Sequence, residues 1–439
     1  MTPLSSDQHL FQLFGRFFLL DAPSGSLMAL DEEAYLVLTG QRPASAEVAE
    51  EIETLKAQGL LQPDPLSMAP PEQTGNKRLK ALCLHVAHDC NLRCTYCFAG
   101  GGTFGGGRQR MMASVARGAL DLLLRESGPI KQLEVDFFGG EPLLALDTVK
   151  DAVAYGRQQA AALGKRINFT LTTNAVLLDP PALAYLNEQG ISLVLSLDGR
   201  PATHNRFRPD AGGAGSYERA TRGILPAIQS RHDTNYYVRG TFTRANLDFC
   251  ADVKHLLSLG ITRLSLEPVV CAPDAGYAIR EEDLPVIEAE YEKLADLYLE
   301  CARSGRGFVF FHFEVDLDRG PCPAKRLSGC GAGQRYLAVT PDGELYPCHQ
   351  FVGRSEYLMG DLQSGIVRPD LTEAFNSADI WHKNGCLQCW ARYFCGGGCH
   401  ANAVLRHGDL SQPDAAGCRL LRKRLECALA IKAMQPETD

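Results

Sequence analysis

The chain has 439 residues, 45% of them hydrophobic and 22% charged, which is the composition of a folded globular protein rather than of a disordered or fibrous one. Its acidic residues outnumber its basic ones by 52 to 44, and the formal net charge is −8. Nucleic acid and anionic lipid are bound by clustered cations, so we expect neither as a partner.

The first 21 residues lack the basic start of a secretory signal, and no uncharged apolar run reaches the roughly 18 residues of a membrane-spanning helix. We therefore expect a cytoplasmic protein with no membrane partner. Its 16 cysteines then need an explanation other than disulfides, because the cytosol keeps thiols reduced. Eleven of them fall into two groups, which indicates metal binding.

Residues 1–62 are predicted to form a small separate domain. Two or three short strands are expected within residues 9–20 and 26–30, followed by helices at 31–38 and 46–58. Residues 63–79 contain four prolines and little apolar periodicity, so they are expected to be a linker.

Short apolar runs alternate with helical stretches through residues 80–270, which predicts an α/β domain with a parallel sheet, either open or closed into a partial barrel. The expected strands are 82–87, 133–138, 167–173, 191–197, 236–242 and 264–267. The expected helices between them are 114–125, 146–162, 181–188, 217–230 and 247–259. In such domains ligands gather at the carboxyl ends of the strands.

Two further regions follow this domain. Residues 271–319 are predicted to be a bridging helix and strand, with the helix at 282–303. Residues 320–439 are rich in Gly and Cys and poor in large apolar residues until a helix at 419–434. Metals or cross-links must stabilise such a region, because it cannot build an ordinary core.

The first cysteine group, Cys90, Cys94 and Cys97, directly follows the first predicted strand. Three thiolates can bind three irons of a 4Fe-4S cluster and leave the fourth iron open to a ligand. The alternative is a zinc knuckle that lacks one ligand or takes His88 as its fourth.

With Tyr96 before its last cysteine and the alternation of strands and helices behind it, this motif resembles the radical S-adenosylmethionine (radical SAM) superfamily over residues 80–267. The resemblance implies that the open iron binds SAM and that one electron cleaves SAM to a 5′-deoxyadenosyl radical. The radical then comes from the cofactor, and no side chain is expected to be catalytic.

Polar residues at later strand ends resemble the superfamily's SAM contacts, although any one of them is also common at the end of an ordinary strand. The implied SAM-binding residues are Tyr96, Gly139, Gly140, Glu141, Pro142, Thr173, Asn174, Ser196, Asp198 and Glu267. Asp136, Asp198 and Glu314 are carboxylates suited to acid–base chemistry, but the sequence does not fix the distances between them.

The second cysteine group occupies the C-terminal region. Its thiolates are nearly enough to bind two 4Fe-4S clusters with four ligands each, and the alternative is that they bind zinc in two zinc ribbons. It resembles the SPASM extension of radical SAM enzymes that modify peptides. The implied ligands are Cys330, Cys348 and Cys399 for auxiliary cluster I, and Cys386, Cys389, Cys395 and Cys418 for auxiliary cluster II. Cys322 either completes cluster I or is a plain thiol that leaves one iron open. The expected cofactors are three 4Fe-4S clusters and SAM.

Several stretches resemble the SCIFF peptide maturases more closely than the superfamily at large, namely residues 85–90, 134–142, 237–244, 280–284 and 331–353. Those enzymes make thioether cross-links in Cys-rich precursor peptides and so produce ranthipeptides. The resemblance implies that a substrate Cys thiolate, held on auxiliary cluster I, bonds to a carbon radical of an acceptor residue. A reductase, flavodoxin or ferredoxin is expected as the electron donor.

The N-terminal domain resembles a PqqD-type winged helix, which pairs the leader of a precursor peptide with a sheet edge. A DNA-binding winged helix is the alternative, but the domain's only cations are Arg16, Arg42 and Lys56, and the second predicted helix is acidic.

Two other functions are compatible with parts of the sequence. An anaerobic sulfatase maturase oxidises Cys or Ser to formylglycine, but that family places an aspartate directly after the second cluster I cysteine, where this chain has His349. The chain could also be a zinc-stabilised peptide-binding scaffold without catalysis.

Overall fold

The computed structural model of the chain describes residues 4–62, 78–232, 234–317 and 327–435. Two compact units emerge, each built from separate stretches of the sequence. The terminal unit comprises Met1–Gly75, Leu284–Gly329 and Ala378–Asp439, and the barrel unit comprises Asn76–Asp283 and Cys330–Ser377. The predicted domain limits stay predictions, and residues 63–77 of the expected linker lie outside the described residues.

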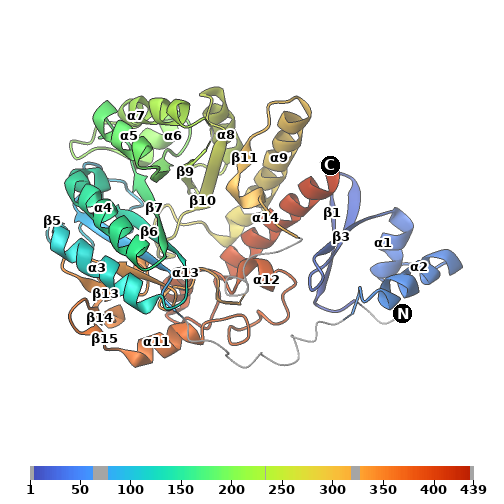
Figure 1. Cartoon of the computed structure of the whole chain (residues 1–439). Helices are drawn as coiled ribbons and strands as arrows, with labels where there is room; N and C mark the ends of the chain where they lie inside the picture. The colour runs from blue at the N-terminus through green and yellow to red at the C-terminus, as the bar shows by residue number, and fades with distance from the viewer. Residues whose placement is uncertain (1–3, 63–77, 233, 318–326, 436–439) are drawn as a thin grey trace. The chain divides into compact units, whose positions relative to one another are not determined.

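Six parallel strands form the centre of the barrel unit and follow one another in chain order across the sheet (Figure 1). They are β4 (Ala81–His88), β6 (Gln132–Gly139), β7 (Arg166–Thr173), β8 (Ser192–Ser196), β9 (Tyr236–Phe242) and β10 (Arg263–Pro268). The helices that follow them are α3 (Ala113–Glu126), α4 (Leu146–Ala162), α5 (Pro180–Glu188), α6 (Pro201–Phe207), α7 (Tyr217–Ser230) and α8 (Phe249–Ser258). The predicted α/β fold with a parallel sheet in a partial barrel is confirmed, and only α6 was not expected.

Shorter elements complete the barrel unit. They are β5 (Gln109–Arg110), β12 (Tyr336–Val339), β13 (Glu344–Tyr346), β14 (Gly360–Asp361), β15 (Gly365–Ile366), α11 (Pro369–Asn376) and the 3-10 helices η2 (Pro142–Ala145), η3 (Glu281–Asp283), η5 (His349–Phe351) and η6 (Ser355–Tyr357). Strand β12 pairs in parallel with β4, so part of the Cys-rich region extends the barrel sheet. None of the four strands β12–β15 exceeds four residues, too short for a period to be recognised in the sequence.

In the terminal unit, the strands and helices predicted within residues 9–58 are present as three antiparallel strands and two helices, here called the N-terminal domain. The elements are β1 (Gln8–Leu13), β2 (Arg16–Asp21), β3 (Ser26–Leu30), α1 (Glu32–Leu38) and α2 (Ala46–Ala57). Asp31 and Ser45 cap the two helices by accepting hydrogen bonds from backbone amides. A small core that includes Leu19, Val37 and Ile52 holds the strands and helices together.

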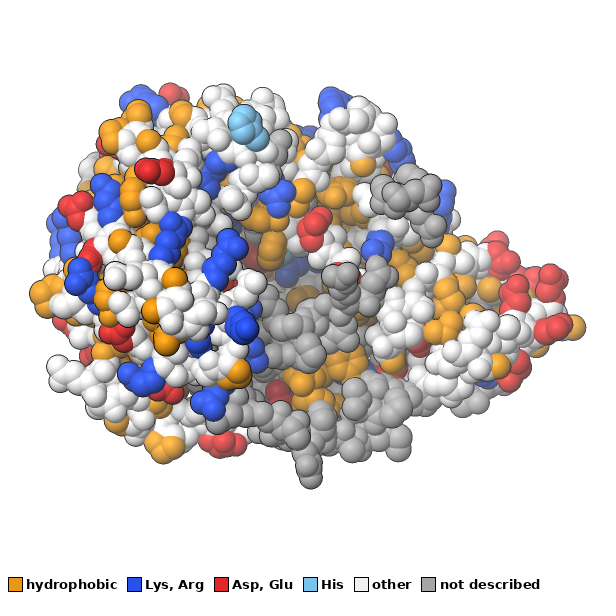
Figure 2. Space-filling model, in the orientation of Figure 1, with side chains coloured by type: hydrophobic (Ala, Val, Ile, Leu, Met, Phe, Trp, Pro, Cys, Tyr) orange, Lys and Arg blue, Asp and Glu red, His pale blue; other side chains and the backbone are white. Residues whose placement is uncertain are grey.

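The surface of α2 is acidic, as the sequence predicted. Exposed Glu47, Glu50, Glu51 and Glu53 lie along this helix, and Figure 2 shows acidic side chains gathered where α1 and α2 lie in Figure 1. Such a surface repels phosphate, which disfavours nucleic-acid binding by this domain.

The rest of the terminal unit is mainly helical, and its long helices α9 and α14 pack against each other. Its elements are α9 (Leu284–Arg303), β11 (Val309–Phe310), η4 (Phe311–Phe313), α12 (Arg392–Cys395), α13 (His400–His407) and α14 (Ala415–Met434). Among the described residues, no helix carries an apolar stretch long enough to cross a bilayer.

Stability is expected to fall in mild acid because His204, on α6, is wholly buried. Its Nε2 lies 2.9 Å from the Ser216 hydroxyl, and its Nδ1 accepts from the Asp198 amide at 3.4 Å, an arrangement that suits a neutral ring. Burial lowers the pKa of His204 to about 4. Between this value and the unfolded pKa of about 6.5 the unfolded chain binds more protons, so stability falls as the pH falls.

The expected loss from His204 alone is about 2 kcal/mol in the free energy of unfolding between pH 7 and pH 5. Anaerobic urea titrations at the two pH values would measure it. His204→Gln should show a pH dependence weaker by that amount, and an unchanged pH dependence would contradict the assignment.

Candidate functional site

The first cysteine group lies on the loop that leaves the carboxyl end of β4. Cys90, Cys94 and Cys97 are close enough for their charges to interact, so the loop gathers three thiols at one edge of the barrel. Burial raises the pKa of Cys90 to about 12 and that of Cys94 to about 11. Both thiols therefore stay protonated at neutral pH unless a metal replaces their protons.

This loop is anchored through Tyr96, whose hydroxyl donates to the Asp198 carboxylate over 2.6 Å. Arg208 donates to both oxygens of that carboxylate, at 3.0 and 3.1 Å, and the Thr241 amide donates at 3.0 Å. Asp198 is wholly buried, and these hydrogen bonds offset the cost of burying its charge. Asp198 thus ties the cysteine loop to the ends of β8 and β9.

Two glycines at the end of β6 allow it to approach the cysteine loop. A Cβ on Gly140 would lie 2.1 Å from the Asp89 carbonyl oxygen, and a Cβ on Gly139 would lie 2.4 Å from that of Ala87. Neither position can hold a side chain, so the close packing of the backbone requires glycine at both. Pro142 then enters the helix η2 at its first turn.

Buried Glu141 links the polar residues at the end of β6 to those at the end of β7. Its carboxylate accepts from the Thr173 hydroxyl at 2.6 Å and from the Asn174 amide at 2.9 Å. The Asn174 side chain donates to the Asn91 oxygen at 2.8 Å and lies 3.8 Å from the Cys90 sulfur. The ends of β6 and β7 and the cysteine loop therefore form one polar cluster.

Ser196 ends β8 and Glu267 lies near the end of β10, and both are half-buried. Their strands run parallel to β9, so the two residues share the edge of the sheet at which the cysteine loop lies. Their contact with SAM stays a prediction.

The interior of the barrel carries a titratable carboxylate. Val135 and Phe137 are buried on the helix-covered face of β6, so Asp136 between them points to the other face, into the barrel. Burial raises the pKa of Asp136 to about 7, although the Thr172 hydroxyl at 3.3 Å and the charge of Arg239 act in the opposite direction. Asp136 can therefore exchange a proton near neutral pH.

An aromatic cluster lies in the same unit around His349. Its ring centroid is 5.0 Å from that of Phe138 and 5.5 Å from that of Phe98, and its Nδ1 is 3.0 Å from the Tyr336 hydroxyl. Burial lowers the pKa of His349 to about 4, so its ring is neutral at physiological pH. The residue after Cys348 is thus a neutral, half-buried imidazole.

In the terminal unit, four cysteines of the second group come together. Their thiols interact electrostatically, and burial raises the pKa of Cys386 to about 12 and that of Cys418 to about 11. The amides of Gly397 and Gly398 donate to the Cys395 sulfur, as expected for a thiolate ligand of an iron–sulfur cluster. The set is Cys386, Cys389, Cys395 and Cys418, the predicted ligands of auxiliary cluster II.

The other predicted ligand set stays a prediction. Cys330 and Cys348 belong to the barrel unit and Cys399 to the terminal unit, and Cys322 lies outside the described residues. Among the described residues, no three His, Cys, Asp or Glu side chains lie close enough to share a single metal ion. A cubane sets its thiolates farther apart, on separate irons.

Two features of the site were not predicted from the sequence. Arg208 lies in no recognisable sequence motif. Its role in positioning the cysteine loop is seen only from its ion pair with buried Asp198. The rings of His85 and His88 approach to 3.2 Å between Nδ1 and Nε2 behind that loop. The spacing of the two histidines is visible in the sequence, but it does not distinguish a packed pair from a ligand pair.

Comparison with known proteins gives the following likenesses. Residues 84–238 match the radical SAM superfamily. The chain is 26% identical over 338 residues to the serine-type anaerobic sulfatase-maturating enzyme of Klebsiella aerogenes, covering 72% of this chain and 78% of that enzyme. It is 25% identical over 374 residues to the PqqA peptide cyclase of Gluconobacter oxydans, covering 82% of this chain and 96% of that enzyme.

Among solved structures, native anSMEcpe with bound AdoMet is similar, with a TM-score of 0.66 and 20% identity, covering 80% of this chain and 97% of that chain. At this identity the structural likeness shows the fold.

Proposed function

We propose that this chain, which carries a radical SAM domain over residues 84–238, is a cytoplasmic enzyme that installs Cys thioether cross-links in a ribosomally made, Cys-rich precursor peptide. The observation that carries the proposal is the pair of gathered cysteine sets. One set lies at the strand ends of the barrel, and the other lies in the Cys-rich region. The relative named as a peptide cyclase supports a peptide as the substrate class.

The residues at the end of β4 fit a 4Fe-4S cluster with one open iron. Cys90, Cys94 and Cys97 supply three thiols, and the two glycines at the end of β6 let its backbone pack directly against the loop that carries them. Together with SAM, a cluster held there would supply the oxidant that removes a hydrogen atom from the peptide. We assign the set Cys386, Cys389, Cys395 and Cys418 to auxiliary cluster II, and Cys330, Cys348 and Cys399 to auxiliary cluster I.

Buried carboxylates beside this loop have distinct roles. Glu141 accepts three hydrogen bonds from the protein and keeps an acceptor position for the SAM amino group. Asp198 is saturated by Tyr96 and Arg208, so we assign it to positioning the loop rather than to direct SAM contact.

Joining a substrate thiol to a substrate carbon removes two hydrogens. One would leave the carbon as an atom and end in 5′-deoxyadenosine, and the other would leave the thiol as a proton. The remaining electron would pass to auxiliary cluster I, which we assign to Cys330, Cys348 and Cys399. The resemblance led us to expect no catalytic side chain, but Asp136, inside the barrel and with a pKa near 7, is suited to take the proton. The nearby charge of Arg239 favours the ionised form of Asp136, which is the form that accepts a proton.

Asp136→Asn should therefore lower the rate of cross-linking about a hundredfold and remove the limb of the pH–rate profile near pH 7. Release of 5′-deoxyadenosine without peptide should stay unchanged, because that step does not need the proton acceptor. The matched control is Asp121→Asn, on the outer helix α3. An unchanged pH profile in the Asp136 variant would contradict the role.

The N-terminal domain is proposed to bind the leader of the precursor peptide. Its three-stranded sheet has two edge strands, β1 and β3, to which an extended segment can be added through backbone hydrogen bonds. The electrons are proposed to come from a reductase, a flavodoxin or a ferredoxin.

Mass spectrometry tests the function directly. A synthetic peptide with six cysteines, incubated anaerobically with the reconstituted chain, SAM and dithionite, should lose two hydrogens per link. The linked cysteines should also resist alkylation. A peptide of unchanged mass, in a reaction that does form 5′-deoxyadenosine, would contradict the thioether chemistry.

A sulfatase-maturase function is the second candidate, supported by the 26% identical relative. That reaction converts a Cys to formylglycine with loss of its sulfur, or a Ser with loss of two hydrogens. In the Ser case the mass change equals that of one thioether link, but the cysteines stay open to alkylation, so mass and alkylation together distinguish the two functions. The neutral, half-buried His349 after Cys348 does not favour it, because the imidazole pKa of about 4 makes it a poor base.

A further inference from the structure

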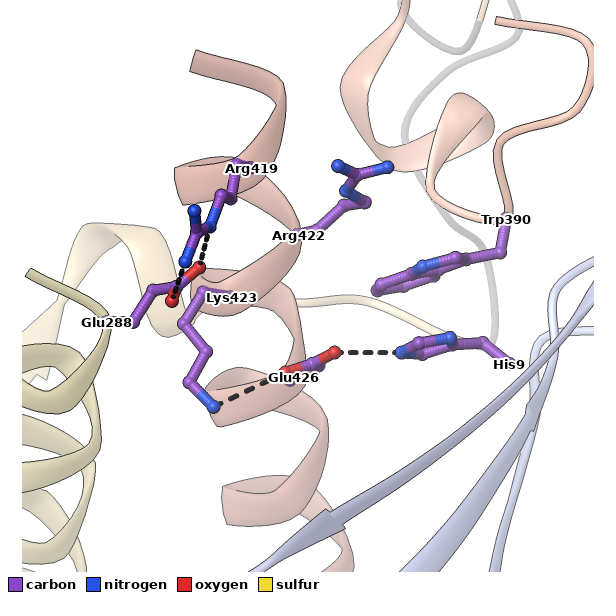
Figure 3. Close-up of a pocket in the computed structure, with 7 residues that line it drawn as sticks. All are labelled: His9, Glu288, Trp390, Arg419, Arg422, Lys423 and Glu426. Atoms are coloured by element: carbon purple, nitrogen blue, oxygen red, sulfur yellow. Dashed lines mark hydrogen bonds and ion pairs between the residues drawn. The ribbon is translucent and has the colours of Figure 1, made fainter. Parts of the chain in front are cut away.

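The terminal unit contains an open pocket of about 480 Å³, within the size range of small-ligand sites (Figure 3). Four elements meet around it, namely strand β1, helices α9 and α14 and the loop before α12. None of its lining residues has been assigned to the cysteine clusters or to the barrel interior.

Most charges in the pocket are already paired. Arg419 donates to both oxygens of Glu288, at 2.6 and 2.7 Å, which is a bidentate ion pair. Glu426 accepts from Lys423 at 3.4 Å and lies 2.9 Å from His9 Nε2. These contacts leave little net charge on that side of the pocket.

Arg422 differs from its neighbours on α14. It is exposed, and it has no hydrogen-bond or ion-pair partner in the part of the chain that the structure describes. Figure 3 shows its guanidinium extending from α14 toward the side of the pocket formed by Trp390. Its charge also acts on the Cys418 thiol, but no carboxylate pairs with it among the described residues.

Trp390 gives the pocket a fixed aromatic wall. Its ring stacks on that of His9, with centroids 3.9 Å apart and planes 5° from parallel, and Glu426 holds the imidazole from the side. Trp390 is 9% exposed, so it orders this side of the pocket and offers a small apolar surface next to the guanidinium.

We propose that this pocket is an anion subsite in which Arg422 binds a carboxylate side chain of the peptide substrate, an inference that rests on the proposed function. A monoanionic, planar carboxylate matches one guanidinium. A dianion such as phosphate would need a second free cation, and Arg419 and Lys423 are already paired with carboxylates. The pocket is open, and His9 lies on an edge strand of the N-terminal sheet, so an extended chain can run past it.

Fluorescence anisotropy of the reconstituted full-length protein tests this without turnover. The probes are two fluorescein-labelled decapeptides, one alternating Glu with Leu and the other alternating Gln with Leu. The protein should bind the Glu peptide about tenfold more tightly, and added salt should reduce the difference.

Arg422→Gln should abolish the preference for the Glu peptide, and Arg422→Glu should reverse it toward a third probe that alternates Lys with Leu. The matched control is Arg222→Gln, which changes an exposed arginine on α7 of the barrel unit and should keep the preference. A tenfold preference that survives in Arg422→Gln would overturn the proposal.

Free succinate serves as the competitor that distinguishes a peptide carboxylate from a small acid. Displacement of the Glu peptide by an equal concentration of succinate would overturn the peptide assignment. Because the assay measures binding alone, an Arg422-dependent preference would stand even if no thioether formed. Thioether formation by Arg422→Gln would support the proposed function only, and the binding assay alone would decide the role of Arg422.

Discussion

Replacing Cys94 with Ala is expected to abolish the release of 5′-deoxyadenosine from SAM. The variant removes one of three thiols that the loop after β4 holds together, and a cubane left with two protein ligands is not retained. The iron content should fall by roughly four per chain from roughly twelve, because the auxiliary sites keep their own ligands. Anaerobic reconstitution, iron analysis and chromatography of the nucleoside product measure both effects.

The matched control for Cys94 is Cys301→Ala, a substitution of a buried cysteine on α9 that belongs to neither cysteine group. It should retain full iron and full nucleoside release. A Cys94 variant that still released 5′-deoxyadenosine at the rate of the unaltered chain would show that this loop does not hold the SAM-cleaving cluster.

Replacing Cys348 with Ala is expected to have the second largest effect, the loss of thioether formation with SAM cleavage intact. The proposed role of auxiliary cluster I is in the peptide reaction alone, whereas SAM is bound at the end of β4. Mass spectrometry of the peptide and measurement of 5′-deoxyadenosine in the same reaction separate the two activities.

Cys330→Ala serves as a second variant, because Cys348 is buried and its loss could disturb packing. Cys330 is exposed, so its replacement removes a thiol with little loss of packing. Intact cross-linking in both variants would refute the proposed role of this ligand set.

The barrel was predictable from the sequence because its strands and helices are long enough to show their periods. Strand β9 (Tyr236–Phe242) and helix α7 (Tyr217–Ser230) begin and end at the predicted residues. In β6, β7, β8 and β9 buried residues recur at every second position, a signal that needs no tertiary information. The grouping of Cys90, Cys94 and Cys97 was also predictable, because all three lie close together in the sequence on one short loop.

Contacts between distant residues were not predictable. Tyr96 and Asp198 are 102 residues apart, and nothing in either local sequence indicates that the hydroxyl donates to the carboxylate. The raised pKa of Asp136 depends on its burial inside the barrel, which strand alternation alone does not determine. The pairing of Trp390 with His9 joins two ends of the chain, and only the folded terminal unit brings them together.

The account depends on one claim, that the loop carrying Cys90, Cys94 and Cys97 holds an iron–sulfur cluster which cleaves SAM. The most direct measurement is the yield of 5′-deoxyadenosine from SAM after anaerobic reconstitution of the unaltered chain and reduction with dithionite. We predict that the nucleoside forms and that its yield depends on each of the three cysteines. Protein that binds iron in full and yet forms no 5′-deoxyadenosine would contradict the claim.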